Sequence, residues 1–97
     1  MSDIPGVAIF VAKPGEETKL EALLQTLVEP TRQEPGCLQY DLHVDIKEPR
    51  RFVFIERWES QEALAGHGKT AHIAHFREHG PALIESKEVD FLRKLPI

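Results

Sequence analysis

The sequence predicts an α+β fold of the ferredoxin-like kind, a split βαβ arrangement in which helices cover one face of a four-stranded antiparallel sheet. Apolar residues recur at the three-and-four spacing of a helix in residues 20–28. They alternate with polar residues at the period of a strand in residues 37–45, and a second strand-like segment follows at residues 52–58. With the flanking segments, the order becomes strand, helix, strand, strand, broken helix, strand.

The first strand and the first helix are separated by a turn. Residues 7–12 are wholly apolar and end before Pro14-Gly15, which is typical of a strand buried on both sides. Glu16 and Glu17 follow the turn and predict the start of a helix there, because the amino terminus of a helix favours negative charge. Pro30 and the Glu34-Pro35-Gly36 segment end the helix, which the pattern extends through residue 32. Its apolar face consists of Leu20, Leu23, Leu24, Leu27 and Val28.

The next two segments are predicted to form a hairpin. Residues 46–50, which include Pro49, connect them at hairpin length, so we expect antiparallel pairing. The second strand has Leu38, Tyr40, Leu42 and Val44 on one side. The third has Phe52, Phe54, Glu56 and Trp58 on one face and Val53, Ile55 and Arg57 on the other.

A broken helix and a closing strand complete the predicted fold. Ser60 is a good cap for a helix over residues 61–67, which is interrupted at Gly66-His67-Gly68. A second helical piece over residues 70–79 stops at Gly80-Pro81. The closing strand is predicted from Val89, Phe91 and Leu95.

One face of this sheet lacks a helical cover. Because the first and third strands are apolar on both sides, the simplest cover for the open face is the same face of a second copy. We therefore expect a twofold homodimer.

Length and composition predict one soluble domain over residues 1–97, with 41% hydrophobic and 29% charged residues. A net charge of −4, with no basic run longer than Arg50-Arg51, argues against a nucleic-acid partner. The apolar runs are far shorter than the roughly 20 residues that span a bilayer, so no membrane partner is expected. The lone Cys37 and the lack of a leader-like amino terminus favour the cytoplasm, with Cys37 as a small buried hydrophobe.

Glu56 is the first candidate for chemistry. It lies between Phe54 and Trp58 on one strand face, where desolvation raises the proton affinity of a carboxylate that has no cationic partner. Glu56 then becomes a general base near neutral pH. The structural alternative is an ion pair with Arg57, Arg77 or Arg93, or a carboxylate in the dimer seam.

Two histidines are further candidates. His72 shares a predicted helix face with Phe76, and an imidazole facing an apolar pocket can take a phenolic proton. Its structural alternative is a core histidine bonded to a backbone carbonyl. His67 lies in the glycine-flanked break, where we expect it to be mobile and partly exposed. Although His72, His75 and His79 share one helix side, we expect no metal site there, because no Cys or carboxylate lies at the adjoining helical spacing.

Aromatic residues supply the expected pocket wall. Trp58 offers a flat face for an aromatic ligand, while Phe54 and Phe76 are expected to form wall and core. The sequence has no phosphate-binding glycine loop, nucleophilic serine motif, or flavin or nicotinamide fingerprint. We therefore expect no cofactor, and the substrate itself has to supply the reactivity.

Several of these segments together resemble one family. Residues 35–43, 51–58 and 60–64, with His67 and His72, resemble the antibiotic biosynthesis monooxygenase family, and are nearest to its small bacterial quinol-monooxygenase-like branch. The Pro-Gly-Cys, Glu-Arg-Trp and paired-histidine elements keep their relative order over nearly the whole chain. The resemblance implies a dimeric α+β barrel.

For activity, the resemblance implies cofactor-free oxidation of dihydroxy- or polyhydroxy-aromatic substrates by dioxygen. Polyketide-tailoring members are associated with an active-site Asn, and this sequence contains none, so a small quinol-like substrate is favoured. We expect His72, assisted by Glu56 or His67, to take a hydroxyl proton. Two alternatives stay open: an isomerase of a small hydroxy-carbonyl compound, and a non-catalytic small-molecule-binding dimer.

Overall fold

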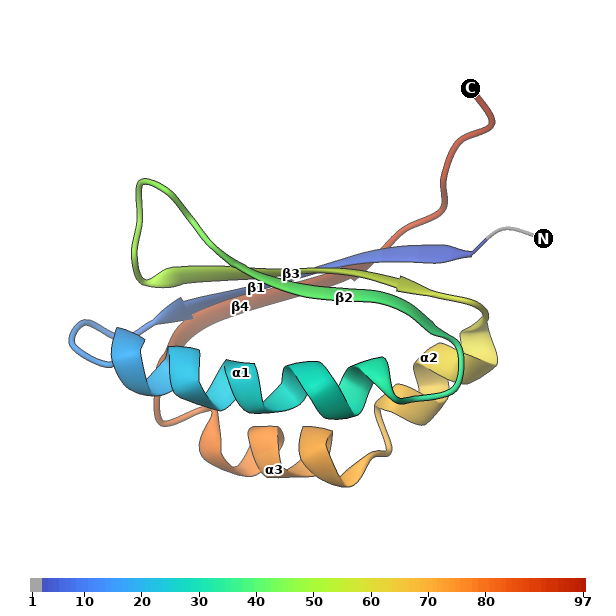
Figure 1. Cartoon of the computed structure of the whole chain (residues 1–97). Helices are drawn as coiled ribbons and strands as arrows, with labels where there is room; N and C mark the ends of the chain where they lie inside the picture. The colour runs from blue at the N-terminus through green and yellow to red at the C-terminus, as the bar shows by residue number, and fades with distance from the viewer. Residues whose placement is uncertain (1–2) are drawn as a thin grey trace.

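The computed structural model describes residues 3–97 (Figure 1). The strands pair antiparallel in the order β2-β3-β1-β4, which confirms the predicted ferredoxin-like α+β fold. In chain order the elements are β1 (Ile4–Ala12), α1 (Glu17–Arg32), β2 (Cys37–Val44), β3 (Arg51–Trp58), α2 (Gln61–His67), α3 (Ala71–His79) and β4 (Ile84–Phe91).

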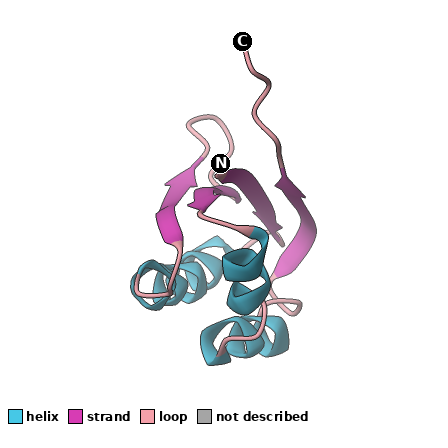
Figure 2. Cartoon of the chain, turned by 90° about the vertical axis from the view of Figure 1, so that its right-hand side faces the viewer, coloured by secondary structure: helices cyan, strands magenta, loops and turns pink. Residues whose placement is uncertain are grey.

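In the described part of the chain, the helices all lie on one face of the sheet, and none lies on the opposite face (Figures 1 and 2). The alternation of β3 explains which face is covered. Phe52, Phe54, Glu56 and Trp58 are buried towards the helices, whereas Ile55 on the other face is 42% exposed. The cross-strand neighbours of Ile55 on that open face are Val7 and Asp41.

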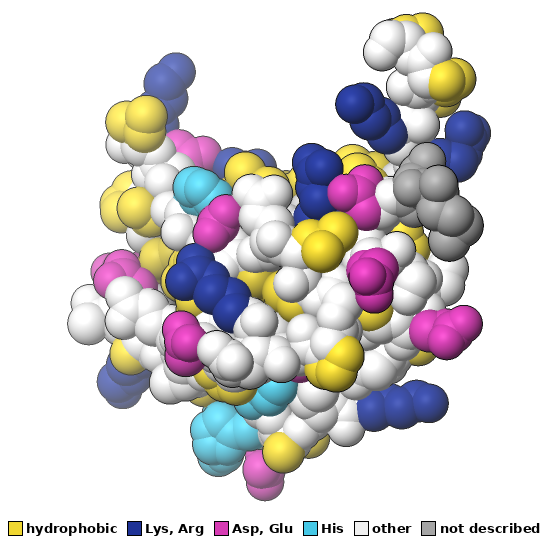
Figure 3. Space-filling view, turned by 45° about the vertical axis from the view of Figure 1, so that its right-hand side comes forward, with side chains coloured by type: hydrophobic (Ala, Val, Ile, Leu, Met, Phe, Trp, Pro, Cys, Tyr) yellow, Lys and Arg dark blue, Asp and Glu magenta, His cyan; other side chains and the backbone are white. Residues whose placement is uncertain are grey.

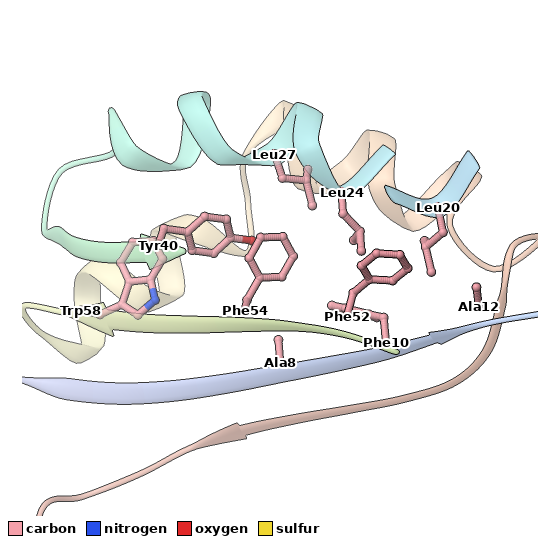
Figure 4. Packing of buried hydrophobic residues seen from close by; sticks show 10 residues of the cluster. All are labelled: Ala8, Phe10, Ala12, Leu20, Leu24, Leu27, Tyr40, Phe52, Phe54 and Trp58. Atoms are coloured by element: carbon pink, nitrogen blue, oxygen red, sulfur yellow. The ribbon is translucent and has the colours of Figure 1, made fainter. Parts of the chain in front are cut away.

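The core lies between α1 and the central strands β1 and β3 (Figure 4). Leu20, Leu24 and Leu27 of α1 are fully or almost fully buried, as their helical spacing predicts. Beneath them, the Phe10 and Phe54 rings meet edge to face, with 6.3 Å between centroids. The same face of the sheet therefore supplies both the core and, further along β3, Glu56 and Trp58.

The closing strand differs from its prediction. β4 begins at Ile84, well before Val89, and ends at Phe91, so Leu95 lies outside it. Its pairing with β1 explains both ends, because Ile84 pairs with Ala12 and Phe91 with Gly6. The apolar pattern is weak over this strand because β4 is an edge strand with mostly exposed side chains.

The remaining surface agrees with the charge pattern of the sequence. Cationic and anionic side chains are interspersed on the face shown in Figure 3, without a continuous basic stripe there. Among residues 3–97, every helix is too short or too polar to cross a lipid bilayer.

Two glycines occupy the left-handed region that disfavours other residues. Gly15 has φ +86° in the turn before α1, and Gly36 has φ +81° in the turn before β2. A Cβ on Gly36 would lie 2.5 Å from the Cβ of Ala63 in α2, whereas a Cβ on Gly15 meets no atom within 4 Å. Gly36 therefore allows the α1–β2 turn to touch α2.

This difference makes a paired test of stability. We expect Gly15→Ala to lower the free energy of unfolding by about 1–2 kcal/mol through backbone strain alone. Gly36→Ala should cost about 1–3 kcal/mol more, because overpacking against Ala63 adds to the same strain. Urea denaturation of both variants measures the difference. Equal losses would show that the turn moves away from α2 without cost.

Candidate functional site

Three titratable side chains meet where α1, α2 and α3 come together. The Glu34 carboxylate lies in the turn after α1, His67 ends α2, and His72 lies in the first turn of α3. Oxygen Oε2 of Glu34 is 2.9 Å from Nδ1 of His67 and 2.6 Å from Nε2 of His72. All three side chains are largely buried, with exposed fractions of 9%, 12% and 20%. We call this group the Glu34 cluster.

The contacts of the Glu34 cluster allow the tautomers of both imidazoles to be assigned. Because an ionised carboxylate can only accept a hydrogen bond, we assign the donated hydrogen to Nδ1 of His67 and to Nε2 of His72. When His67 is neutral, its other nitrogen, Nε2, carries a free lone pair. The carboxylate thus fixes His67 as a proton acceptor at Nε2.

His67 is held in place on its other sides as well. Its ring lies 4.7 Å from Trp58 and 5.7 Å from Tyr40, measured between centroids. These contacts restrain the ring, and 12% of its side chain remains exposed, so His67 is less exposed than its place between two glycines predicts. The glycines on either side of it end the helix without loosening the side chain, because packing and the Glu34 hydrogen bond hold the ring.

Glu56 is a buried carboxylate, with only 4% of its surface exposed. Its Oε1 accepts a 2.8 Å hydrogen bond from Nε1 of the fully buried Trp58. Burial raises the pKa of Glu56, and the Trp58 hydrogen bond and the nearby His67 offset only part of that effect. Two of the predicted arginine partners are engaged elsewhere: Arg57 pairs with Asp3, and Arg77 donates to the carbonyl of Gly68.

A cavity of about 340 Å³ opens between the sheet and helices α2 and α3. Its polar lining includes Glu56, His67 and the Tyr40 phenol, whose pKa is raised by burial so that the hydroxyl stays protonated. Its apolar walls include Phe54 and Phe76. A neighbouring hollow of about 500 Å³, beside Pro81, is lined by no imidazole.

The structure separates the predicted site residues into two groups. Glu56, His67, Phe54 and Phe76 border the cavity together. Trp58 and His72 are not among its lining residues: the indole is covered completely, and His72 turns to Glu34. Trp58 therefore supports Glu56 and His67 from behind and presents no face to a ligand.

Sequence reasoning missed four residues of this region. Arg77 and Lys87 border the cavity and place positive charge beside it. The strand pattern predicts only which side of the strand Tyr40 lies on. Glu34 belongs to the segment that predicts the end of the first helix, and nothing in its spacing relates it to His67, which lies 33 residues later. The remaining histidines stay apart from the site: His43 is exposed, and His75 and His79 lie beside each other on α3 with centroids 4.3 Å apart.

The raised pKa of Glu56 predicts a pH-dependent stability difference. The folded state binds the Glu56 proton more tightly than the unfolded state does, so the contribution of Glu56 to stability is greatest at a pH below its ordinary, unfolded-state pKa. The contribution is lost as the pH rises through the higher pKa that Glu56 has in the folded protein. Glu56→Gln does not titrate, so its stability relative to the parent should increase as pH rises from about 4 towards 7.

Urea denaturation at several pH values measures this difference. Glu62→Gln, at an exposed position in α2, makes the same change in net charge and serves as the control. If the difference in free energy of unfolding between Glu56→Gln and the parent stays constant with pH, burial does not raise the pKa of Glu56.

Known proteins resemble this chain in both sequence and structure. The family model described as "Antibiotic biosynthesis monooxygenase" matches residues 7–79. The "Putative monooxygenase YcnE" of Bacillus subtilis is 34% identical over 86 residues, which cover 89% of this chain and 90% of that protein. The crystal structure of PA3566 from Pseudomonas aeruginosa superposes with a TM-score of 0.94 at 38% identity, covering 98% of this chain and 96% of that one.

A longer relative matches over part of its length. The "Uncharacterized protein sll1783" of Synechocystis sp. is 39% identical over 72 residues, which are 74% of this chain. The matched region is 49% of that protein, so the chain spans about half of its length. The family match, the similarity to proteins of similar length and the shared fold lead to one conclusion: the chain belongs to the antibiotic biosynthesis monooxygenase family.

Proposed function

We propose that this protein is a cofactor-independent monooxygenase that oxidises a small quinol-like aromatic compound with dioxygen. The observation that supports this proposal is the position of His67, which is oriented by the Glu34 carboxylate at the wall of a cavity that also contains Glu56. Family membership supports oxygenation, and the site supports the substrate class.

The cavity suits a small aromatic substrate. Its volume of about 340 Å³ is at the low end of ligand pockets, and apolar side chains form most of its wall. Arg77 and Lys87 at its border favour an anion, which matches a deprotonated phenol. Tyr40 is a neutral hydrogen-bond donor for a substrate oxygen.

In the proposed reaction, Nε2 of His67 takes one hydroxyl proton, because Nδ1 donates to Glu34. Glu34 stabilises the imidazolium that forms, and His72 keeps Glu34 in position from the opposite side. Glu56 accepts a hydrogen bond from the second hydroxyl through Oε2, since Oε1 is bonded to Trp58. The role expected for His72 as the direct base thus passes to His67.

The substrate anion then reacts with dioxygen. One electron passes from the ring to dioxygen, and the resulting radicals combine to form a carbon–oxygen bond and a ring hydroperoxide. Loss of the proton from that ring carbon breaks the oxygen–oxygen bond and leaves a carbonyl, while the second oxygen departs as water. The substrate supplies all four electrons, so a quinol and dioxygen give a hydroxyquinone and water. The protein positions the reactants and keeps bulk water away.

The open sheet face supports a homodimer as the working form. Apolar Val7, Ile9, Val11 and Val53 are only partly buried there, and Ile55 is 42% exposed. Two such faces pressed together would shield this surface. The single thiol of Cys37, which forms no disulfide, fits our placement of the protein in the cytoplasm.

Oxygen consumption with a hydroquinone series tests the enzyme assignment. We expect His67→Ala to lower kcat/KM by about 10²- to 10⁴-fold, the usual contribution of a general base. Glu34→Gln should cause a smaller loss, because the imidazole remains but loses its stabilising charge. His75→Ala, on the exposed side of α3, should keep the parental rate.

Two outcomes would contradict the proposal in different ways. If His67→Ala turns over at the parental rate, His67 is not the base. If the parent converts a hydroxy-ketone in the absence of dioxygen and oxidises no quinol, the chemistry is isomerisation at the same base.

Light scattering during size-exclusion chromatography tests the dimer. We expect twice the chain mass of 11.0 kDa for the parent. Ile55→Glu should give the mass of one chain, because it places a charge on the open face where the partner would bury it. Ala22→Glu, on the exposed side of α1, is the matched control and should remain dimeric. A parent with the mass of one chain would remove the proposed interface.

A further inference from the structure

We infer that the Glu34 cluster is also a binding site for a divalent first-row transition-metal ion, of which Zn²⁺ is the type case. Glu34, His67 and His72 each offer one ligand atom, and these atoms all lie within 4.8 Å of one another. The site goes beyond the proposed oxidation and does not depend on it.

The directions of the hydrogen bonds carry the inference. His67 and His72 both direct a ring nitrogen at the same oxygen of Glu34, so the lone pairs left after loss of the two shared hydrogens converge on the place that this oxygen now occupies. A cation replaces the two hydrogens when the carboxylate moves back and leaves it room between the three ligand atoms. The nitrogen–oxygen distances of 2.6 and 2.9 Å need to widen to about 3.3 Å for tetrahedral ligands at 2.0–2.1 Å from the ion. Glu34 lies in a turn, so a rotation of its carboxylate provides this space.

The donor set selects the class of ion. Two imidazoles and one carboxylate suit Zn²⁺, Ni²⁺, Co²⁺ or Fe²⁺, whereas Mg²⁺ and Ca²⁺ prefer sites built from oxygen. Three protein ligands leave at least one position for water or an exogenous group. His72, with 20% of its side chain exposed, gives the ion a route from solvent.

Metal binding has a defined effect on His67. An ion at Nδ1 takes the position of the hydrogen now donated to Glu34, so a neutral His67 then carries its hydrogen on Nε2. That tautomer has no lone pair with which to accept a substrate proton. If the proposed oxidation is correct, the ion therefore inhibits it, and a chelator restores it.

Trp58 provides a built-in reporter for binding. It is the only tryptophan of the chain, and its ring centroid lies 4.7 Å from that of His67. We expect Ni²⁺ or Co²⁺ to quench its fluorescence in chelator-treated protein, and calorimetry with Zn²⁺ to give one ion per chain. Glu34→Gln and His72→Gln should each weaken binding at least tenfold. The double variant His75→Ala/His79→Ala, which removes the other imidazoles of α3, should bind as tightly as the parent.

Nuclear magnetic resonance of ¹⁵N-histidine tests the tautomer directly. In Zn²⁺-loaded protein, His67 should show a metal-bound Nδ1 and a protonated Nε2, and circular dichroism should show that the Gln variants keep the parental fold. The inference is overturned if the parent shows no saturable binding below millimolar concentration, or if binding is lost in the His75/His79 double variant. Equal binding by the parent and both Gln variants would overturn it as well. None of these measurements requires turnover. They therefore test the metal site even if the protein does not oxidise a quinol.

Discussion

The hydrogen bond from the Trp58 indole to the Glu56 carboxylate fixes the buried base of this site, and the other contacts of the site build on it. Both groups lie on the helix-facing side of β3, and both are almost completely removed from water. A carboxylate in such surroundings needs a partner, and a bond of this kind contributes about 1.5–3 kcal/mol. Because the indole is fixed in this way, its ring gives His67 a rigid surface against which to pack.

His67 connects this buried pair to the helices. It closes α2, touches Trp58 on one side and donates to Glu34 on another. Each contact limits a different motion of the ring, so its free nitrogen has one orientation. The Glu34 carboxylate in turn joins the end of α1 to the start of α3 through His72. Polar groups therefore join three helix ends beside Trp58 and Tyr40, which both belong to the apolar core.

The two faces of the sheet differ because successive side chains of a strand point to opposite sides. Alternate residues of β3 face the helices and supply the core and the carboxylate, while Val53 and Ile55 remain on the open face. A covering helix on that face would need additional chain, whereas a second copy would need none. The proposed dimer thus follows from the same alternation that builds the cavity.

The order of the elements, the two sets of residues that face opposite sides of β3, and the presence of Glu56 and an imidazole near a shared apolar space can all be read from the sequence. These features depend on local periods of two and 3.6 residues, which can be read from neighbouring positions. The three-dimensional arrangement is needed to see that His67, and not His72, borders the cavity, and that Glu34 joins them. That arrangement depends on how three helix ends meet, and residues 33 and 38 positions apart in the chain carry no periodic signal of such a meeting.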